Sequence, residues 1–133
     1  KTKAIKDFAK QMMSLFDIRT TSENKPVNTL SGGNQQKVII AREISSDPKL
    51  LLASQPTRGV DIGAIEFIHK ELVKARDKGK AILLVSADLD EVLSLSDRIG
   101  VIYKGKIIKE FQREEATKER LGYYMTGGKD DKN

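Results

Sequence analysis

The sequence lacks cysteine and tryptophan and contains a single histidine. The absence of cysteine excludes disulfides, thiolate metal sites and cysteine nucleophiles, and it fits a reducing compartment. Long hydrophobic runs are also missing, because the longest is the five-residue run Ala81–Val85. A helix needs about 20 apolar residues to cross a bilayer, so we expect no membrane-spanning segment. Residues 2–16 mix charged with apolar side chains, unlike a secretory signal.

The composition that remains is typical of one globular domain. The 133 residues are 38% hydrophobic and 32% charged, with 24 Lys and Arg against 19 Asp and Glu, a net charge of +5. Because the basic residues are interleaved with acids and no aromatic stacking platform accompanies them, we expect no nucleic-acid partner. The first residue is Lys1 rather than Met, so we expect a piece of a longer protein.

Helical and strand-like patterns alternate along the chain. The spacing of apolar residues predicts helices over 2–17, 31–46, 62–78, 89–95 and 113–125, and strands over 50–53, 81–85, 99–103 and 106–111. In the first helix the apolar stripe is typical of core packing, and in the second we expect Val38, Ile39, Ala41 and Ile44 to be buried. The run 50–53 is continuous enough for a strand buried on both faces, and 81–85 is another continuous apolar run. This order predicts an α/β fold with a parallel sheet.

The most informative segment is Leu30–Lys37, with the sequence Leu-Ser-Gly-Gly-Asn-Gln-Gln-Lys, which we call the signature segment. Ser31 is a typical helix N-cap, and Gly32 and Gly33 follow it in the first turn. Backbone N–H groups and the positive end of a helix dipole can bind phosphate at such a position, and glycines allow close approach. An ordinary capped helix is the alternative that Ser-Gly-Gly alone leaves open.

The signature segment resembles the signature motif of ATP-binding-cassette (ABC) ATPases, and three further motifs follow in the order of that family. The strand 50–53 resembles the Walker B strand, and Gln55–Asp61 resembles its end and the D-loop. Residues 84–89 with 96–99 resemble the switch region and the next strand. The residues of these motifs are most similar to those of the tandem-cassette ATPases of sugar and nucleoside importers, particularly the nucleoside or basic-membrane-lipoprotein branch.

This resemblance implies a partial P-loop NTPase fold, the fold of an ABC cassette. A largely parallel sheet would be flanked by helices and followed by a strand hairpin and a last helix, with the Walker A part absent. Residues 1–30 would end a helical subdomain, residues 31–126 would form the signature helix and catalytic-core portion, and residues 127–133 would be a disordered tail.

Three positions depart from the family pattern. Ser54 and Gln55 stand where the family has the Walker B aspartate and the catalytic glutamate, and Ala87 stands where it has the switch histidine. A neutral hydroxyl is a weak ligand for Mg²⁺, an amide cannot accept a proton as a carboxylate does, and a methyl group has neither donor nor acceptor. We therefore expect a degenerate site of the chain's own, rather than three tolerated substitutions.

The resemblance also implies which residues contact the nucleotide. Two cassettes of this family meet head to tail, so Ser31, Gly32 and Gly33 would contact the γ-phosphate of ATP held by the partner cassette. The expected cofactor-binding residues are Ser31, Gly32, Gly33, Asn34, Gln35 and Asp61. A helix cap alone is sufficient to explain Asp61, and the resemblance adds a D-loop role in which Asp61 faces the partner cassette; both can hold. The cofactors would be ATP and Mg²⁺ in the full dimeric complex, with no metal ligand from this chain.

Two other patterns are weaker candidates for functional sites, one for phosphate and one for a metal. Gly100–Ile107 matches G-x-x-x-x-G-K, but Ile107 replaces the Ser or Thr that contacts Mg²⁺, and Gly105 falls between two expected strands rather than before a helix. Asp88, Asp90 and Glu91 fall in the first turn of an expected helix, where acids are favoured without any metal. We reject the first as a phosphate site and the second as a metal site.

The sequence therefore predicts the ATP-binding subunit of an ABC importer for sugars or nucleosides, at the cytoplasmic face of the cell membrane. Its partners would be a second cassette, membrane permease subunits and, indirectly, a solute-binding lipoprotein. The chain alone is expected to be inactive. Two alternatives remain: a soluble ABC ATPase acting on ribosomes or DNA, and an interaction module with no nucleotide role.

Overall fold

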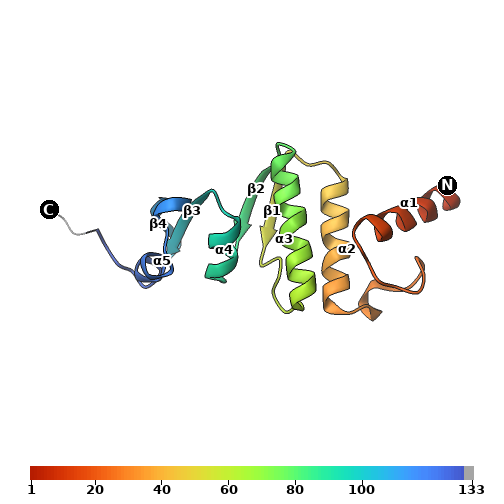
Figure 1. Cartoon of the computed structure of the whole chain (residues 1–133), viewed down its shortest axis with the longest axis horizontal. Helices are drawn as coiled ribbons and strands as arrows, with labels where there is room; N and C mark the ends of the chain where they lie inside the picture. Colours follow the sequence, from red (N-terminus) through yellow and green to blue (C-terminus); the bar gives the residue numbers. More distant parts are fainter. Residues whose placement is uncertain (131–133) are drawn as a thin grey trace. The chain divides into compact units, whose positions relative to one another are not determined.

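The computed structural model describes residues 1–130, and it divides into two compact units, Lys1–Leu83 and Leu84–Asn133. Figure 1 labels the α-helices and strands of both units. The first unit holds helices α1 (Thr2–Leu15), α2 (Gly32–Ser45) and α3 (Ile62–Asp77), the 3-10 helix η1 (Val27–Thr29) and strand β1 (Leu50–Ser54). The boundary between the units falls within strand β2 (Ala81–Val85). These bounds match the predicted ones to within two residues.

Helix α1 does not bury its apolar stripe within this chain. Ile5, Phe8 and Leu15 are 67%, 53% and 63% exposed, and no residue of the helix is buried. The prediction that this stripe packs in the core is wrong for the chain described here. Burial begins only after the helix ends, at Phe16 and Ile18. The Phe16 ring packs edge-on against the ring of Phe67 in α3, with 6.4 Å between the ring centres.

Helices α2 and α3 lie side by side in the first unit (Figure 1). The buried residues of α2 are Gly33, Lys37, Ile40 and Ala41, and those of α3 are Ala64, Ile68, Leu72 and Ala75. Both sets repeat at three and four residues, as one face of a helix requires. The prediction that Ile39 faces the core is wrong, because Ile39 is 42% exposed and Ile40 takes the inner position.

Strands β1 and β2 form a two-stranded sheet, and α3 makes the crossover between them. Strand β1 alternates, with Leu51 and Ala53 buried and Leu50 and Leu52 59% and 63% exposed. The prediction that this strand is buried on both faces is therefore wrong in this chain. A run of four apolar residues fits a doubly buried strand, but only one face of β1 has a covering layer here.

The second unit is built around an antiparallel hairpin of β3 (Arg98–Tyr103) and β4 (Lys106–Gln112). Lys104 and Gly105 form its two-residue turn with φ of 47° and 75°, both in the left-handed region that such turns use. Gly105 thus lies between two strands as predicted, whereas a P-loop joins a strand to a helix. A register shift between Val101 and Ile102 marks a bulge.

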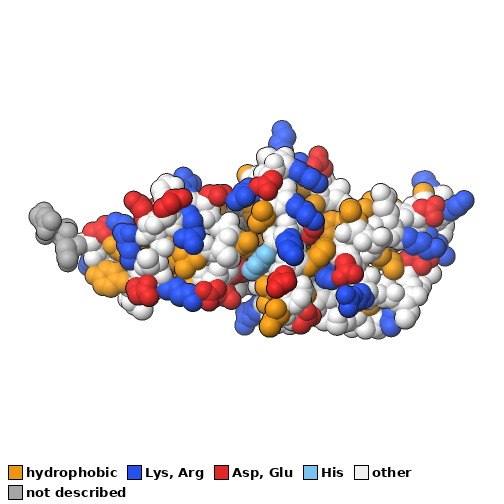
Figure 2. Space-filling view, in the orientation of Figure 1, with side chains coloured by type: hydrophobic (Ala, Val, Ile, Leu, Met, Phe, Trp, Pro, Cys, Tyr) orange, Lys and Arg blue, Asp and Glu red, His pale blue; other side chains and the backbone are white. Residues whose placement is uncertain are grey.

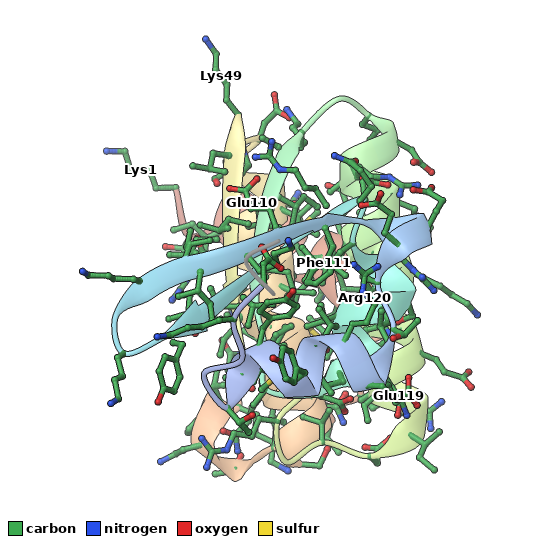
Figure 3. All side chains as sticks on the ribbon, turned by 90° about the vertical axis from the view of Figure 1, so that its left-hand side faces the viewer. Lys1, Lys49, Glu110, Phe111, Glu119 and Arg120 are labelled. Carbon is green, nitrogen blue, oxygen red and sulfur yellow. The ribbon has the colours of Figure 1, made fainter. Side chains whose placement is uncertain are left out.

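Helices α4 (Leu89–Leu95) and α5 (Lys118–Met125) complete the second unit with the 3-10 helix η2 (Arg113–Glu115). The core consists of Ile99, Val101, Phe111, Ala116, Leu121 and Tyr124. Phe111 lies between the hairpin and α5, with the Arg120 guanidinium 4.7 Å from its ring (Figure 3). The predicted start of the last helix at Arg113 is wrong, because that residue begins η2 and Thr117 caps α5.

Part of the predicted tail 127–133 is placed. Asp130 accepts hydrogen bonds from Tyr124 and from Lys109 Nζ, the latter at 2.8 Å, and these bonds lower the pKa of Asp130. Residues 131–133 lie outside the described residues. Over residues 1–130, no helix is long and apolar enough to span a membrane.

Candidate functional site

The N-terminus of α2 is built by Ser31. Its backbone is extended (φ −60°, ψ 154°), and its Oγ accepts the Asn34 N–H at 3.4 Å. Ser31 and Gly32 are both exposed. Because the first amides of a helix have no partner within it, the N–H groups beside this cap lie at the positive end of the helix dipole. This is the geometry in which a helix binds an anion.

The two glycines of the signature segment have different surroundings. A Cβ on Gly32 would lie 3.6 Å from the Gly59 carbonyl oxygen, an ordinary contact. A Cβ on Gly33 would lie 2.8 Å from Asp61 Oδ2 and 2.9 Å from the Ala64 Cβ, closer than real Cβ atoms come. Gly33 is therefore required for the close approach of α2 to the start of α3, and Gly32 leaves the exposed side of the cap open.

The side chains of Asn34 and Gln35 are held within this chain. Asn34 Nδ2 donates to Ser31 Oγ at 2.9 Å, and Gln35 Nε2 donates to the Leu30 carbonyl at 2.8 Å. Both residues are half-buried. A contact of either side chain with nucleotide stays a prediction, and the bonds seen here are those that shape the loop before α2.

Asp61 caps α3. Its Oδ1 accepts the Ala64 N–H at 3.0 Å, and its backbone is extended. The cap that the sequence left open as one alternative is thus present. The residue is exposed, and a D-loop role toward a partner cassette stays a prediction.

The positions expected to carry catalysis hold neutral side chains. Ser54 is exposed at the end of β1, and Gln55 is half-buried with φ of 49°, in the left-handed region that few residues other than glycine adopt. A turn follows, in which the Arg58 N–H donates to the Gln55 carbonyl at 3.2 Å. Ala87 belongs to the second unit and is exposed.

The acidic cluster of the second unit serves as a helix cap. Asp88 Oδ1 accepts the amides of Asp90 and Glu91 at 2.9 and 3.2 Å. Asp90 pairs with Lys118 at 2.6 Å, and this hydrogen bond raises the pKa of Lys118. Within residues 1–130, no group of three or more His, Cys, Asp or Glu side chains could hold a metal ion.

Sequence reasoning missed Lys37, the most buried charged residue of the first unit, at 7% exposure. Its Nζ donates to the Asp17 carbonyl at 2.9 Å and to Asp17 Oδ2 at 2.8 Å, and it lies 4.7 Å from the centre of the Phe67 ring. The hydrogen bond and charge of Lys37 lower the pKa of Asp17. Its burial could have been predicted from its spacing of four residues from Gly33 and from Ala41, which places Lys37 on the buried face of the helix.

Comparisons with known proteins agree with this architecture. The family model described as "ABC transporter" matches residues 1–58. The nucleoside import ATP-binding protein NupA of Lactococcus lactis subsp. cremoris (strain MG1363) is 54% identical over 124 residues, 93% of this chain and 24% of that protein. The guanosine import ATP-binding protein NupO of Bacillus subtilis (strain 168) is 52% identical over 119 residues, 90% of this chain and 23% of that protein. The chain thus spans about a quarter of the length of these relatives.

Solved structures show the same fold. The dimeric structure of MJ0796, a bacterial ABC transporter cassette, is 30% identical with a TM-score of 0.69, covering 79% of this chain and 45% of that one. A second structure of MJ0796, a dimeric post-hydrolysis state bound to ADP and Pi, has a TM-score of 0.68 at 30% identity and covers 77% of this chain and 44% of that one. The fold is therefore that of part of an ABC ATPase cassette, a P-loop NTPase.

The chain belongs to the family of ABC transporter ATP-binding proteins. A sugar-import relative, the ribose import ATP-binding protein RbsA of Oceanobacillus iheyensis, is 46% identical over 128 residues, 96% of this chain and 26% of that protein. These nucleoside and sugar import relatives confirm the family predicted from the four motifs.

Proposed function

We propose that this chain is part of the ATP-binding subunit of an ABC importer for sugars or nucleosides. The N-terminus of α2 would complete a nucleotide site whose phosphates are held mainly by a second cassette. The observation that carries this proposal is the exposed cap of Ser31 and Gly32 at the positive end of a 14-residue helix. The substrate class is supported by the relatives, which are named as nucleoside, guanosine and ribose import ATP-binding proteins.

The residues at the cap fit the terminal phosphate of ATP. A phosphate oxygen accepts hydrogen bonds, and the cap offers a hydroxyl and helix amides as donors on its exposed side. The ADP and Pi in the related dimeric cassette support a nucleotide between two cassettes. ATP bound there would hold the two cassettes together, and Ser31, Gly32 and Gly33 would orient its γ-phosphate.

The residues at the end of β1 do not fit a Mg²⁺ site. Ser54 and Gln55 offer only neutral oxygens, whereas Mg²⁺ in nucleotide sites is bound through carboxylates and phosphates. We infer that this chain's own site is degenerate, and that the one competent site uses Mg²⁺ bound outside this chain. The isolated chain would then neither hydrolyse ATP nor bind it tightly.

The partners follow from the same proposal. A second cassette is required to hold the nucleotide, and permease subunits would carry the solute across the membrane and keep the complex at its cytoplasmic face. A solute-binding lipoprotein would act through the permease. Lys and Arg lie among Asp and Glu over the face shown in Figure 2, which supports the expectation of no nucleic-acid partner.

The test is Ser31→Arg in the assembled importer, with ATP hydrolysis as the readout. A guanidinium chain at the cap would occupy the space of the phosphate, so we expect hydrolysis to fall by about 100-fold or more. Ser45→Arg, at the exposed C-terminal end of the same helix, is the matched control and is expected to hydrolyse at the wild-type rate. Wild-type hydrolysis by Ser31→Arg would contradict the proposal and favour an interaction module without a nucleotide role.

A further inference from the structure

Two N–H donors bond to the Ser31 hydroxyl oxygen, so only the proton of that hydroxyl remains available to a further partner. Its Oγ accepts the backbone N–H of Asn34 at 3.4 Å and the side-chain Nδ2 of Asn34 at 2.9 Å. A hydroxyl has two acceptor lone pairs and one proton to donate. Because a backbone N–H can only donate, and both lone pairs are used, what Ser31 has left to offer is its O–H.

The direction of the Asn34 amide is fixed by a third group. The backbone N–H of Arg19 donates to Asn34 Oδ1 at 2.8 Å. Since that N–H has no acceptor capacity, the amide oxygen must face Arg19, and the amide nitrogen must then face Ser31. The order of donors runs in one direction, from Arg19 through Asn34 to Ser31.

The turn that supplies the Arg19 N–H is itself anchored to α2. Asp17 adopts a left-handed backbone with φ of 47°, and both its carbonyl and its carboxylate accept hydrogen bonds from Lys37. Asn34 and Lys37 are three residues apart, on one side of α2. The same helix therefore holds the turn 17–19 at two points, and the turn in return orients the Asn34 side chain.

We propose that Asn34 is a positioning residue, which turns the Ser31 hydroxyl so that its proton, rather than a lone pair, faces a phosphoryl oxygen. This inference rests on the proposed function and specifies how the cap binds its ligand. A phosphoryl oxygen carries negative charge and only accepts, so a lone pair turned toward it would repel it and a proton would bind it. Asn34 acts through Ser31 and needs no contact with nucleotide.

We call the hydrogen bonds from Arg19 to Asn34 and from Asn34 to Ser31 the relay. A double-mutant cycle in the assembled importer tests it. The variants are Ser31→Ala, Asn34→Ala and the pair together, with the kcat of ATP hydrolysis as the readout and thermal unfolding as the check on folding. We expect Asn34→Ala to lower kcat by about tenfold, the worth of one well-directed hydrogen bond. In the Ser31→Ala background the same substitution is expected to change kcat by less than about twofold, because the hydroxyl that it orients is gone.

Asn34→Asp provides the second variant. Aspartate has nearly the same shape and still accepts from the Arg19 N–H, so the turn keeps its contact, but it cannot donate to Ser31. We expect kcat to fall at least as far as in Asn34→Ala, with most of that loss absent in the Ser31→Ala background. Asn28→Ala, an exposed asparagine of η1, is the matched control and is expected to leave kcat unchanged.

The outcomes separate the relay from the proposed function. An equal fold-loss from Asn34→Ala with and without the Ser31 hydroxyl, or no loss at all, would overturn the relay. A loss from Asn34→Asp that persists in full in the Ser31→Ala background would assign that loss to charge repulsion and would also overturn it. Failure of the proposed function would give a different result, namely wild-type hydrolysis by Ser31→Arg.

Discussion

Helices α2 and α3 lie side by side and begin with different caps. The first amides of α3 meet the carboxylate of Asp61, whereas those of α2 meet the neutral hydroxyl of Ser31. A carboxylate at a helix N-terminus offsets the positive end of the dipole, and a hydroxyl satisfies an amide without offsetting the charge. Both residues cap the N-terminus of a helix, but of the two only the cap of α2 leaves the dipole available to an anionic ligand.

The two glycines at the start of α2 also differ. Gly33 allows α2 to pack closely against α3, and Gly32 leaves the cap exposed. Gly33→Ala would place a methyl group 2.8 Å from Asp61 Oδ2 and 2.9 Å from the Ala64 side chain. We expect a loss of about 1–3 kcal/mol in the free energy of unfolding, the usual cost of overpacking, measured by urea unfolding. This is the largest expected change in stability.

Gly32→Ala is the matched control, since its new methyl group would meet only the Gly59 carbonyl oxygen at 3.6 Å. We expect its free energy of unfolding to equal that of the wild type or to exceed it slightly, because alanine favours a helix more than glycine does. Equal destabilisation by the two substitutions would break the distinction between a packed and an open glycine.

The cap of α3 is the next target. Asp61→Ala removes the acceptor of the Ala64 amide, so we expect a loss of about 1 kcal/mol in the free energy of unfolding. Asp61→Ser replaces one good cap by another and is expected to recover most of that loss. If the serine variant were as unstable as the alanine variant, Asp61 would stabilise α3 through its charge rather than as a cap.

The smallest expected effect is a pH dependence at the turn before α2. Lys37 lowers the pKa of Asp17 below its ordinary value of 3.8 in the folded protein. A lowered pKa means that the unfolded chain binds protons more readily, so this contribution is present above pH 3.8 and is lost as the pH falls through the folded pKa.

Urea unfolding of the wild type and Asp17→Asn across this range measures that contribution. We expect the wild type to be the more stable of the two above the ordinary carboxyl pKa, with the difference shrinking in stronger acid. A difference that stays constant to the lowest pH would mean that the Asp17 charge contributes nothing, and that Lys37 holds the turn through the Asp17 carbonyl alone.

Much of this structure could be predicted from local patterns. Ser31 and Asp61 as caps, the Lys104-Gly105 turn and the helix spacing of α3 each depend on residues close in sequence. Burial was harder to predict, because it depends on which layers cover an element. The exposed face of β1 and the exposed stripe of α1 are apolar enough for a core, but nothing in residues 1–130 buries them.

The hydrogen bonds around the candidate site could not be predicted for the same reason. Lys37 meets Asp17, and Asn34 meets Arg19, across 20 and 15 residues of chain. A lysine on a buried face is visible as a pattern, but its partner is set by the path of the turn after α1. The caps were thus predictable, while the contacts that orient them required the tertiary structure.

Whether the cap of α2 is open to a phosphate can be measured with Ser31→Asp in the assembled importer. Aspartate caps a helix as well as serine does, so the unfolding midpoint should be retained, but its carboxylate places a negative charge where the γ-phosphate would bind. We predict a fall in ATP hydrolysis of about 100-fold or more with folding intact. Hydrolysis at the wild-type rate by this variant would contradict the proposal that the cap binds this phosphate.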